Sequence, residues 1–203
     1  QLLWRMVSAP TGIPMNRLRK GDVHTGEESM VVQELSRLSD LDIWIDDTPR
    51  LSVMKIRARV DELARRMEVD GRKIGLVAVD YLQLMSANAR LERHQQIGEI
   101  TGELKALAKD YKVPVIQLAQ LNRKVEDRSD KHPLMSDLKE SGRIEEDSDV
   151  ILFPFRQAYY ETPVNEATEV AEIIVAKHRN GPTGTAMVEW DKKSMRFVDP
   201  VGF

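Results

Sequence analysis

The sequence predicts an α/β fold with a mainly parallel sheet flanked by helices and with antiparallel strands toward its C-terminal end. Two short apolar runs, 76–80 and 113–118, are typical of buried strands, and a stretch with helical periodicity separates them. Because a strand–helix–strand connection is a right-handed crossover, these strands are expected to pair in parallel. Beyond residue 168, apolar runs follow one another without an intervening helix, which favours antiparallel pairing at one edge.

The composition is that of an ordinary globular chain. The 203 residues include 30 lysines and arginines against 33 aspartates and glutamates, for a net charge of −3, and 41% of the residues are hydrophobic. These values exclude collagen-like, membrane-spanning and wholly disordered proteins. They argue against a polybasic binder, although a nucleic-acid site needs only a local field. Cysteine is absent, so disulfides, thiol catalysis and cysteine-based zinc clusters are excluded.

Three short elements are expected before the first long helix. Residues 1–20 are typical of a short helix followed by a turn and a basic patch, and residues 26–39 are typical of a second helix. The segment Leu41–Ile45 alternates apolar and polar residues, which predicts a short strand.

Two longer amphipathic helices follow. Ser52 is a typical N-cap, and the helix after it has apolar residues three or four positions apart, at Val53, Ile56, Val60, Leu63 and Met67. A helix over roughly 94–111 shows the same spacing, at Ile97, Ile100, Leu104, Leu107 and Tyr111. The arginines off the first stripe are interpreted as a solvated face rather than a binding surface; they are Arg57, Arg59, Arg65 and Arg66.

The second half combines one long polar segment with several strands. Residues 123–148 lack clear periodicity and exceed an ordinary connection, so we expect a functional or disordered loop. The run 150–155 predicts a buried strand. Three further strands are expected at 169–176, 185–190 and 195–198, the last two joined by a turn.

Four polar residues lie at or just past predicted strand ends, where open α/β sheets place their chemistry: Asp80, Gln120, Lys177 and Arg179. Leu76 to Asp80 has the form of a Walker B segment, whose aspartate holds magnesium in nucleotide-binding ATPases. The same pattern also occurs where an aspartate merely caps the next helix. Gln120 has two readings as well, because its amide could sense a phosphate or cap a loop backbone.

Five sequence motifs point to a specific family: DYLQLM (80–85), LKALAKDYKVPV (104–115), QLNR (120–123), SDLKESGRIEEDSDVI (136–151) and KHRNGPTGT (177–185). In order and spacing they resemble the RecA-type motor domain of the DnaB family of replicative helicases. The resemblance covers essentially the whole chain and implies a RecA-like fold. The sequence resembles this family more closely than RecA, RadA or KaiC, which share the fold but lack the DLKESG and KHRNG motifs.

The resemblance implies roles for these residues. Asp80 resembles the Walker B magnesium ligand, and Gln120 the sensor of the γ-phosphate. Lys177 and Arg179 match a lysine and arginine-finger pair that reaches the nucleotide of a neighbouring subunit. The implied cofactors are ATP and Mg²⁺.

The resemblance also implies a DNA-binding loop, in which Lys139, Glu140 and Gly142 match the residues that grip the single-strand backbone. The family usually has arginine where this sequence has Lys139; a lysine still contacts phosphate but without the planar fork. Glycine would let backbone amides approach a phosphate oxygen. His178 stands where the family often has glutamine, and we expect no metal role for it.

No phosphate-binding loop of the form G-x-x-x-x-G-K-[ST] occurs in the 203 residues. We therefore expect residues 1–203 to be a partial RecA-like domain, complete from Walker B onward and without the Walker A region, and inactive as an ATPase by itself. The alternatives are an inactive remnant that binds only DNA or other subunits, and a RecA- or RadA-like recombinase ATPase.

The implied parent protein is an ATP-dependent DNA helicase that acts in DNA replication in the cytoplasm, at a bacterial or phage fork. The implied partners are single-stranded DNA and identical subunits in a hexameric ring, with a primase and a helicase loader in addition. No membrane partner is expected.

Overall fold

A computed structural model describes residues 2–138, 142–161 and 168–200, in two compact units. One unit comprises Asp47–Ile151 and Ala176–Pro182, and it contains Asp80, Gln120 and Arg179. The other comprises Gln1–Asp46, Leu152–Val175 and Thr183–Phe203. Within the described ranges, no helix is long and apolar enough to cross a membrane.

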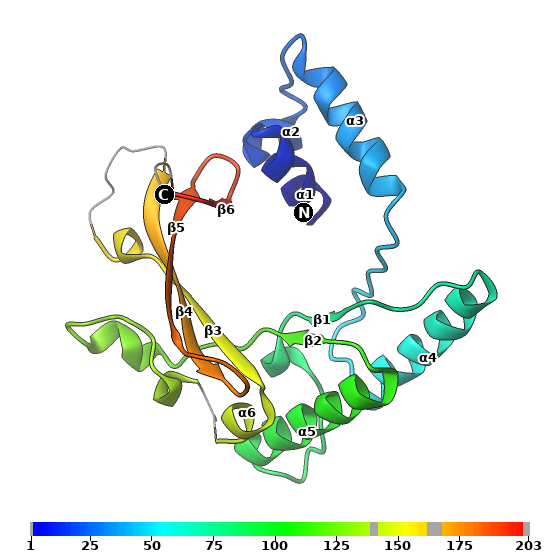
Figure 1. Ribbon diagram of the computed structural model, residues 1–203, viewed down its shortest axis with the longest axis vertical. Helices are drawn as coiled ribbons and strands as arrows, with labels where there is room; N and C mark the ends of the chain where they lie inside the picture. Colours follow the sequence, from blue (N-terminus) through cyan, green and yellow to red (C-terminus); the bar gives the residue numbers. More distant parts are fainter. Residues whose placement is uncertain (1, 139–141, 162–167, 201–203) are drawn as a thin grey trace. The chain divides into compact units, whose positions relative to one another are not determined.

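The first unit is built on a parallel pair of strands, as the sequence predicts. Strand β1 (Val77–Val79) pairs with β2 (Val115–Gln117), with Val79 opposite Gln117, and α5 (Arg93–Tyr111) connects them (Figure 1). The expected full burial of these strands is wrong. Leu76, Ile116 and Leu118 are each about half exposed, because the sheet has only these two strands among the described residues.

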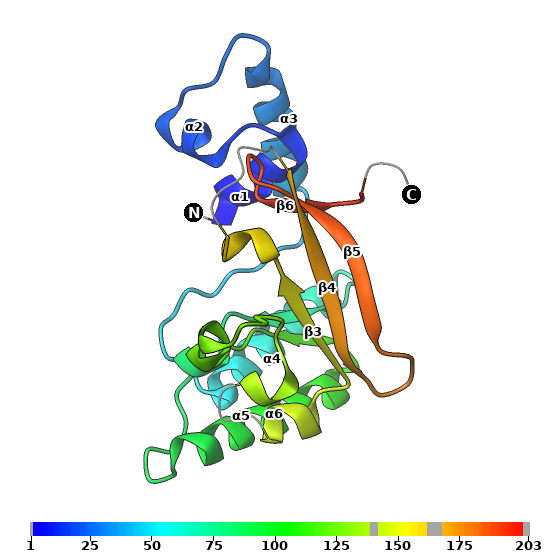
Figure 2. The same ribbon diagram turned by 90° about the vertical axis from the view of Figure 1, so that its left-hand side faces the viewer.

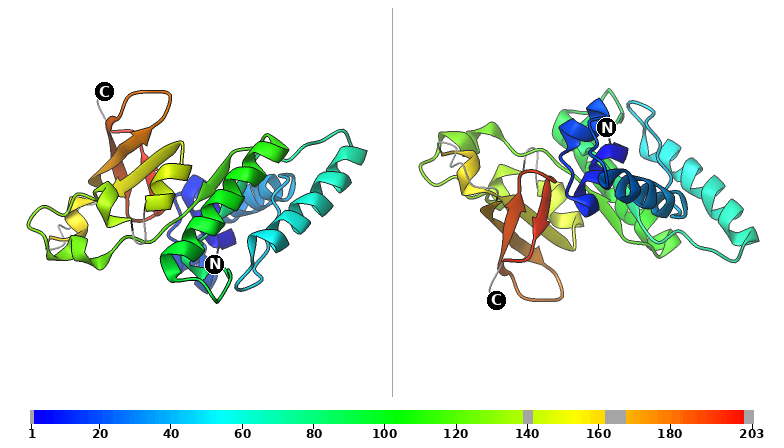
Figure 3. Two further views of the ribbon diagram at one scale, coloured as in Figure 1. Left: turned by 90° about the horizontal axis from the view of Figure 1, so that it is seen from below. Right: turned by 90° about the horizontal axis from the view of Figure 1, so that it is seen from above.

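The two amphipathic helices are confirmed. Helix α4 (Val53–Val69) starts at Ser52, whose hydroxyl accepts a hydrogen bond from the Lys55 amide at 3.4 Å. The predicted stripes face inward: Val53, Val60 and Met67 of α4 and Ile97, Ile100, Leu104 and Leu107 of α5 are buried. Both helices lie side by side and run in the same direction (Figure 3). Arg57 pairs with Asp110 of α5 at 2.7 Å, which agrees with a solvated, ion-paired face.

The polar segment after β2 is more regular than predicted. Its described residues, 123–138 and 142–148, contain three short helices, η2 (Arg123–Asp127), η3 (Met135–Asp137) and α6 (Gly142–Asp147). The Arg128 guanidinium donates to both carboxylate oxygens of Asp137, at 2.9 and 2.7 Å, and closes the loop between them. Val125, Leu138 and Ile144 of this segment are buried. The ion pair and the buried side chains explain why the described residues 123–138 form regular turns although they lack periodicity.

The C-terminal strands form a second sheet with the order β3–β4–β5–β6. The strands are β3 (Val150–Phe155), β4 (Thr168–His178), β5 (Gly184–Asp191) and β6 (Arg196–Val198). The pairs β4–β5 and β5–β6 are antiparallel, as predicted, and β4 and β5 form a long hairpin (Figure 2). The turn after β5 is confirmed: the Asp191 carboxylate accepts a hydrogen bond from the Lys193 backbone amide at 2.9 Å. Only alternate residues of β3 are buried, so its expected burial on both faces is wrong. A short helix, η4 (Gln157–Tyr159), follows β3.

The N-terminal helices have a small core of their own. Helices α1 (Leu2–Thr11), α2 (Met15–Lys20) and α3 (Glu27–Ser39) surround the buried Val7, Ile13 and Leu18. The predicted strand at Leu41–Ile45 is absent from the structure: these described residues are exposed and lie in no strand. Alternation predicts a strand only where a neighbouring strand takes up the backbone hydrogen bonds.

Candidate functional site

Asp80 and Gln120 lie at the same edge of the parallel pair, as predicted. The Leu118 amide donates to the Val79 carbonyl at 3.0 Å, and the Leu82 amide donates to the Leu118 carbonyl at 3.0 Å. The two chain segments thus leave the sheet together, Asp80 directly after β1 and Gln120 three residues after β2. The Asp80–Tyr81 peptide is cis. Both side chains are exposed at this edge, where a ligand can reach them.

Gln83 also belongs to this edge, although it was not among the predicted site residues. It lies in the short helix η1 (Leu82–Leu84). Its side-chain oxygen accepts the Gln120 backbone amide at 3.1 Å, and its side-chain nitrogen donates to the Gln120 carbonyl at 3.5 Å. One neutral amide thus pairs with both backbone groups of Gln120, much as a neighbouring strand would. The only sequence feature that could have indicated Gln83 is its polar side chain between Leu82 and Leu84 in the DYLQLM motif.

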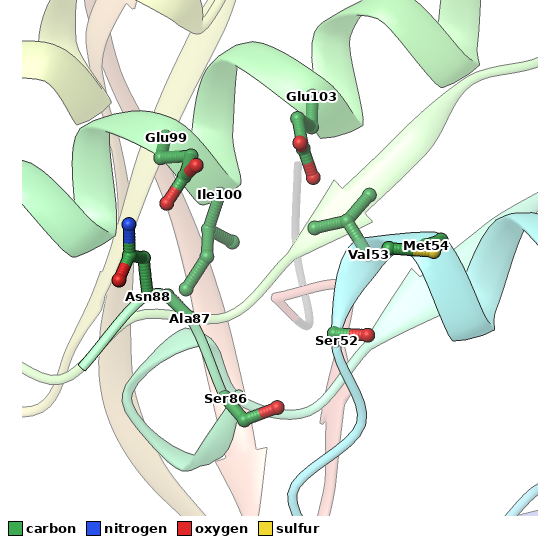
Figure 4. A pocket seen from close by; sticks show the side chains of 9 residues that line it. All are labelled: Ser52, Val53, Met54, Ser86, Ala87, Asn88, Glu99, Ile100 and Glu103. Carbon is green, nitrogen blue, oxygen red and sulfur yellow. The ribbon is translucent and has the colours of Figure 1, made fainter. Parts of the chain in front are cut away.

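A hollow of about 310 Å³ lies against Gln120, Leu121, Asn122 and Arg123. A second hollow, of about 190 Å³, lies between the start of α4, the loop 86–88 and α5 (Figure 4). Glu99 and Glu103 of α5 line this second hollow, which does not include Asp80 or Gln120. The first hollow is therefore the one that adjoins a predicted site residue.

Lys177 and Arg179 form a separate group at the end of β4. The Lys177 ammonium donates to the Glu145 carbonyl. The Arg179 guanidinium donates to the Glu146 carbonyl at 2.9 Å and pairs with the Asp149 carboxylate at 3.2 Å. Both cations therefore dock at the C-terminal end of α6, where carbonyl groups without helical partners and the helix dipole favour positive charge. Within the described residues, no hydrogen bond or ion pair joins this group to Asp80 or Gln120.

Asp149 is the anionic centre of this second group. Its carboxylate also accepts a hydrogen bond from the ammonium group of Lys105, which lies on α5. This hydrogen bond, opposed by partial burial, holds the pKa of Asp149 below its ordinary value, and the charges of Lys105, Arg179 and Lys177 add to the effect. Asp149 is therefore ionised at neutral pH. Neither Asp149 nor Lys105 was predicted from the sequence, because their pairing joins segments that are far apart in the chain.

Of the predicted DNA-binding residues, Gly142 is the first residue of α6 and is exposed. Lys139 and Glu140 lie outside the described residues. Helices α5 and α6 lie side by side (Figure 1). Gly98 permits this packing, since a Cβ there would lie 2.7 Å from Cγ of Arg143. The Thr101 hydroxyl donates to Asp147 at 2.6 Å and anchors the other end of α6 on α5.

The donor set at the β1–β2 edge fits magnesium only together with a nucleotide. No group of three or more His, Cys, Asp or Glu side chains suited to a metal occurs in the part of the chain that the structure describes. Magnesium in phosphoryl-transfer sites is usually held by one or two carboxylates plus substrate phosphates and waters. The single exposed carboxylate of Asp80 matches that pattern, and it does not match a site made by protein side chains alone.

Comparison with solved structures supports the fold. The chain superimposes on a structure described as an ATPase domain with a TM-score of 0.88 and 33% identity, over 98% of this chain and 69% of that one. A structure described as a DnaB-like replicative helicase and its interactions with primase gives a TM-score of 0.87 and 33% identity, over 98% of this chain and 47% of that one. Both likenesses confirm the expected α/β, RecA-like class.

Sequence relatives agree with the structural ones. The replicative DNA helicase DnaB of Leifsonia xyli subsp. xyli is 42% identical over 200 residues, and that of Geobacillus stearothermophilus is 41% identical over 201. These alignments cover 98% of the chain but only 42% and 43% of the relatives. The chain thus spans less than half the length of the curated relatives it matches. Residues 1–199 match the model of the DnaB-like helicase C terminal domain, and the chain therefore belongs to that family.

Proposed function

We propose that this chain is part of the motor of a replicative DNA helicase, which couples ATP hydrolysis to movement along single-stranded DNA and to duplex unwinding. The observation that carries the proposal is the parallel β1–β2 pair, which brings Asp80 and Gln120 to one edge next to a hollow. Membership in the DnaB-like helicase C-terminal domain family supports the same activity. The protein would act at the replication fork inside the cell.

In this proposal Asp80 and Gln120 serve the nucleotide of their own subunit. Asp80 would hold Mg²⁺, which neutralises charge on the nucleotide phosphates when bound. Gln120 would contact the γ-phosphate, and Gln83 would keep its backbone in place. A neutral amide suits a sensor because it can donate to a phosphate oxygen without adding fixed charge.

Lys177 and Arg179 would serve the nucleotide of a neighbouring subunit in a ring, proposed to be a hexamer. Among the described residues, their hydrogen bonds go to α6 and not to the Asp80 edge, which is compatible with action across a subunit boundary. A guanidinium delivered in this way can stabilise the charge of the transition state.

The DNA contact is proposed for Lys139, Glu140 and Gly142. Gly142 begins α6, and the other end of this helix carries the docked Lys177 and Arg179. Primase and a helicase loader are proposed as further partners; one of the similar structures is described with primase.

The proposal is tested by Asp80→Asn in the full-length helicase. Hydrolysis of ATP that depends on magnesium and single-stranded DNA should fall by about 10²-fold or more, because a preorganised charge at the phosphates is removed. Asp70→Asn, which changes an exposed aspartate at the end of α4, is the matched control and should retain full turnover. Unchanged hydrolysis and unwinding in the Asp80 variant would contradict the proposal.

The DNA contact is tested by Lys139→Ala. The salt dependence of single-strand binding should fall by about 0.7 in the log–log slope for each phosphate that is no longer neutralised. Lys73→Ala, at an exposed position before β1, is the control. A slope equal to that of the unmodified protein would remove Lys139 from the proposed DNA-binding residues.

A further inference from the structure

The residue Asp149 is linked to Arg179 through both backbone and side chain. The Arg179 backbone amide donates to the Asp149 carbonyl at 2.8 Å. The Arg179 guanidinium pairs with the Asp149 carboxylate at 3.2 Å through Nη1. Two separate contacts with one residue fix both the start and the end of the Arg179 side chain.

Asp149 is itself held from the other side. Lys105 of α5 occupies Oδ2 of the carboxylate, and Arg179 occupies Oδ1. The hydroxyl of the neighbouring Ser148 accepts a hydrogen bond from the side-chain amide of Gln117 at 3.3 Å. This bond links the segment around Asp149 to the last residue of β2. The Asp149 carboxylate therefore has a second charged partner besides Arg179, and the residue next to it is hydrogen-bonded to β2.

The docked guanidinium keeps capacity for another ligand. An arginine side chain has five N–H donors. Among the described residues, Arg179 donates one hydrogen bond from its side chain, to the Glu146 carbonyl, and its ion pair with Asp149 at 3.2 Å engages one more N–H at most. Three donors remain, enough for a phosphate oxygen. The Arg179 side chain is about half exposed, so these donors are accessible to solvent.

We propose that Asp149 is a positioning residue for Arg179: it orients the guanidinium from β4 while leaving three donors for a phosphate held by a neighbouring subunit. The proposal rests on the proposed function, in which Arg179 acts on that phosphate. Asp149 does not touch the nucleotide. It acts by reducing the number of orientations that Arg179 samples before it meets the phosphate, and thus lowers the entropy lost in reaching the transition state.

The test is Asp149→Asn in the full-length helicase, assayed as DNA-stimulated ATP hydrolysis. The kcat should fall about tenfold while KM for ATP changes less than about twofold, since a positioning defect acts on the transition state. Asp149→Glu, which keeps the charge, should recover part of the loss. Asp110→Asn is the matched control: it too is paired with an arginine, its side chain is 56% exposed against 54% for Asp149, and its partner is Arg57 instead of Arg179.

A double-mutant cycle separates positioning from a general structural role. In an Arg179→Ala background, Asp149→Asn should cause no further loss, because the residue it orients is gone. If the two losses multiply, or if Asp149→Asn leaves kcat unchanged or raises it, the proposal is wrong. If Arg179→Ala alone leaves turnover unchanged, then the proposed function of Arg179 fails instead, and the two failures are distinguishable.

Discussion

The two groups of candidate residues are held by different forces. At the β1–β2 edge, Gln83 pairs with Gln120 through two hydrogen bonds between neutral groups. At the end of β4, Arg179 is held by the ionised Asp149 and by a helix carbonyl. Neutral hydrogen bonds respond little to salt, whereas half-exposed ion pairs are screened by it.

This difference matches the proposed division of labour. Groups that serve the subunit's own nucleotide need one fixed geometry, which strand pairing and a neutral amide provide. Groups that reach across a boundary meet their ligand only in the assembled ring, and at Arg179 a half-exposed ion pair with Asp149 orients the guanidinium before that contact is made. Position in the sheet therefore fixes the first group, while charge balance fixes the second.

The largest expected effect comes from Arg179→Ala. Turnover should fall by about 10³-fold, because an arginine that stabilises the transition-state charge is removed. Nucleotide affinity should remain within about twofold, because Asp80 and Gln120 are untouched. Steady-state kinetics and equilibrium nucleotide binding measure the two quantities. An equal loss of affinity would break the contrast between the groups, since Arg179 would then belong to the nucleotide-binding group.

Asp137→Asn tests the ion pair of Asp137 with Arg128, whose side chains are more buried than those of Asp149 and Arg179. Burial opposes ionisation of Asp137, but the hydrogen bonds from Arg128 and the Leu134 amide outweigh it and hold its pKa below the ordinary value. The substitution should destabilise the loop by about 1.5–3 kcal/mol, the value of hydrogen bonds to a charged group. Hydrogen exchange at the Leu134 amide measures the effect.

The same pair should respond to acid. Because the folded pKa of Asp137 is lowered, its stabilisation is fully present above the unfolded pKa, about 3.9, and is lost as the pH falls through the lower folded value. Protection of the Leu134 amide should therefore decline below about pH 4 in the unmodified chain and change less in the Asp137→Asn variant. A pH response that is equal in both would assign the effect to other groups.

The smallest effect is expected from Gln83→Leu. Loss of both hydrogen bonds to Gln120 should lower turnover about tenfold, with the same loss at low and high salt because no charge is removed. Gln33→Leu, at an exposed position of α3, is the control for the chemical change. A salt-dependent loss would show that the two groups are not held by different forces.

Local patterns predicted the parts of the fold that depend on neighbouring residues in sequence. Helices α4 and α5 follow from apolar stripes and from the N-cap at Ser52. The strand–helix–strand order then predicted the parallel pair, which brings Asp80 and Gln120 to one edge. These predictions held because a helix satisfies its own hydrogen bonds, and because few topologies connect two strands through one helix.

In two segments the local pattern did not predict the observed structure. Leu41–Ile45 has the alternation of a strand but lies exposed outside any strand, while the loop around Arg128 and Asp137 has no periodicity but is ordered. A strand needs a partner strand, and the Arg128–Asp137 ion pair forms only where the loop folds back on itself; hydrophobic periodicity reveals neither condition.

The amino-acid sequence alone was enough to predict the α/β class, the main helices and the positions of Asp80, Gln120, Lys177 and Arg179 at strand ends. What holds these residues emerged only from the folded chain: Gln83 at the backbone of Gln120, and Asp149 with Lys105 beside Arg179. Separation along the chain explains the difference. Periodicity and strand ends are set within a few residues, whereas these contacts join residues that are from about 30 to more than 40 positions apart and exist only after the chain has folded.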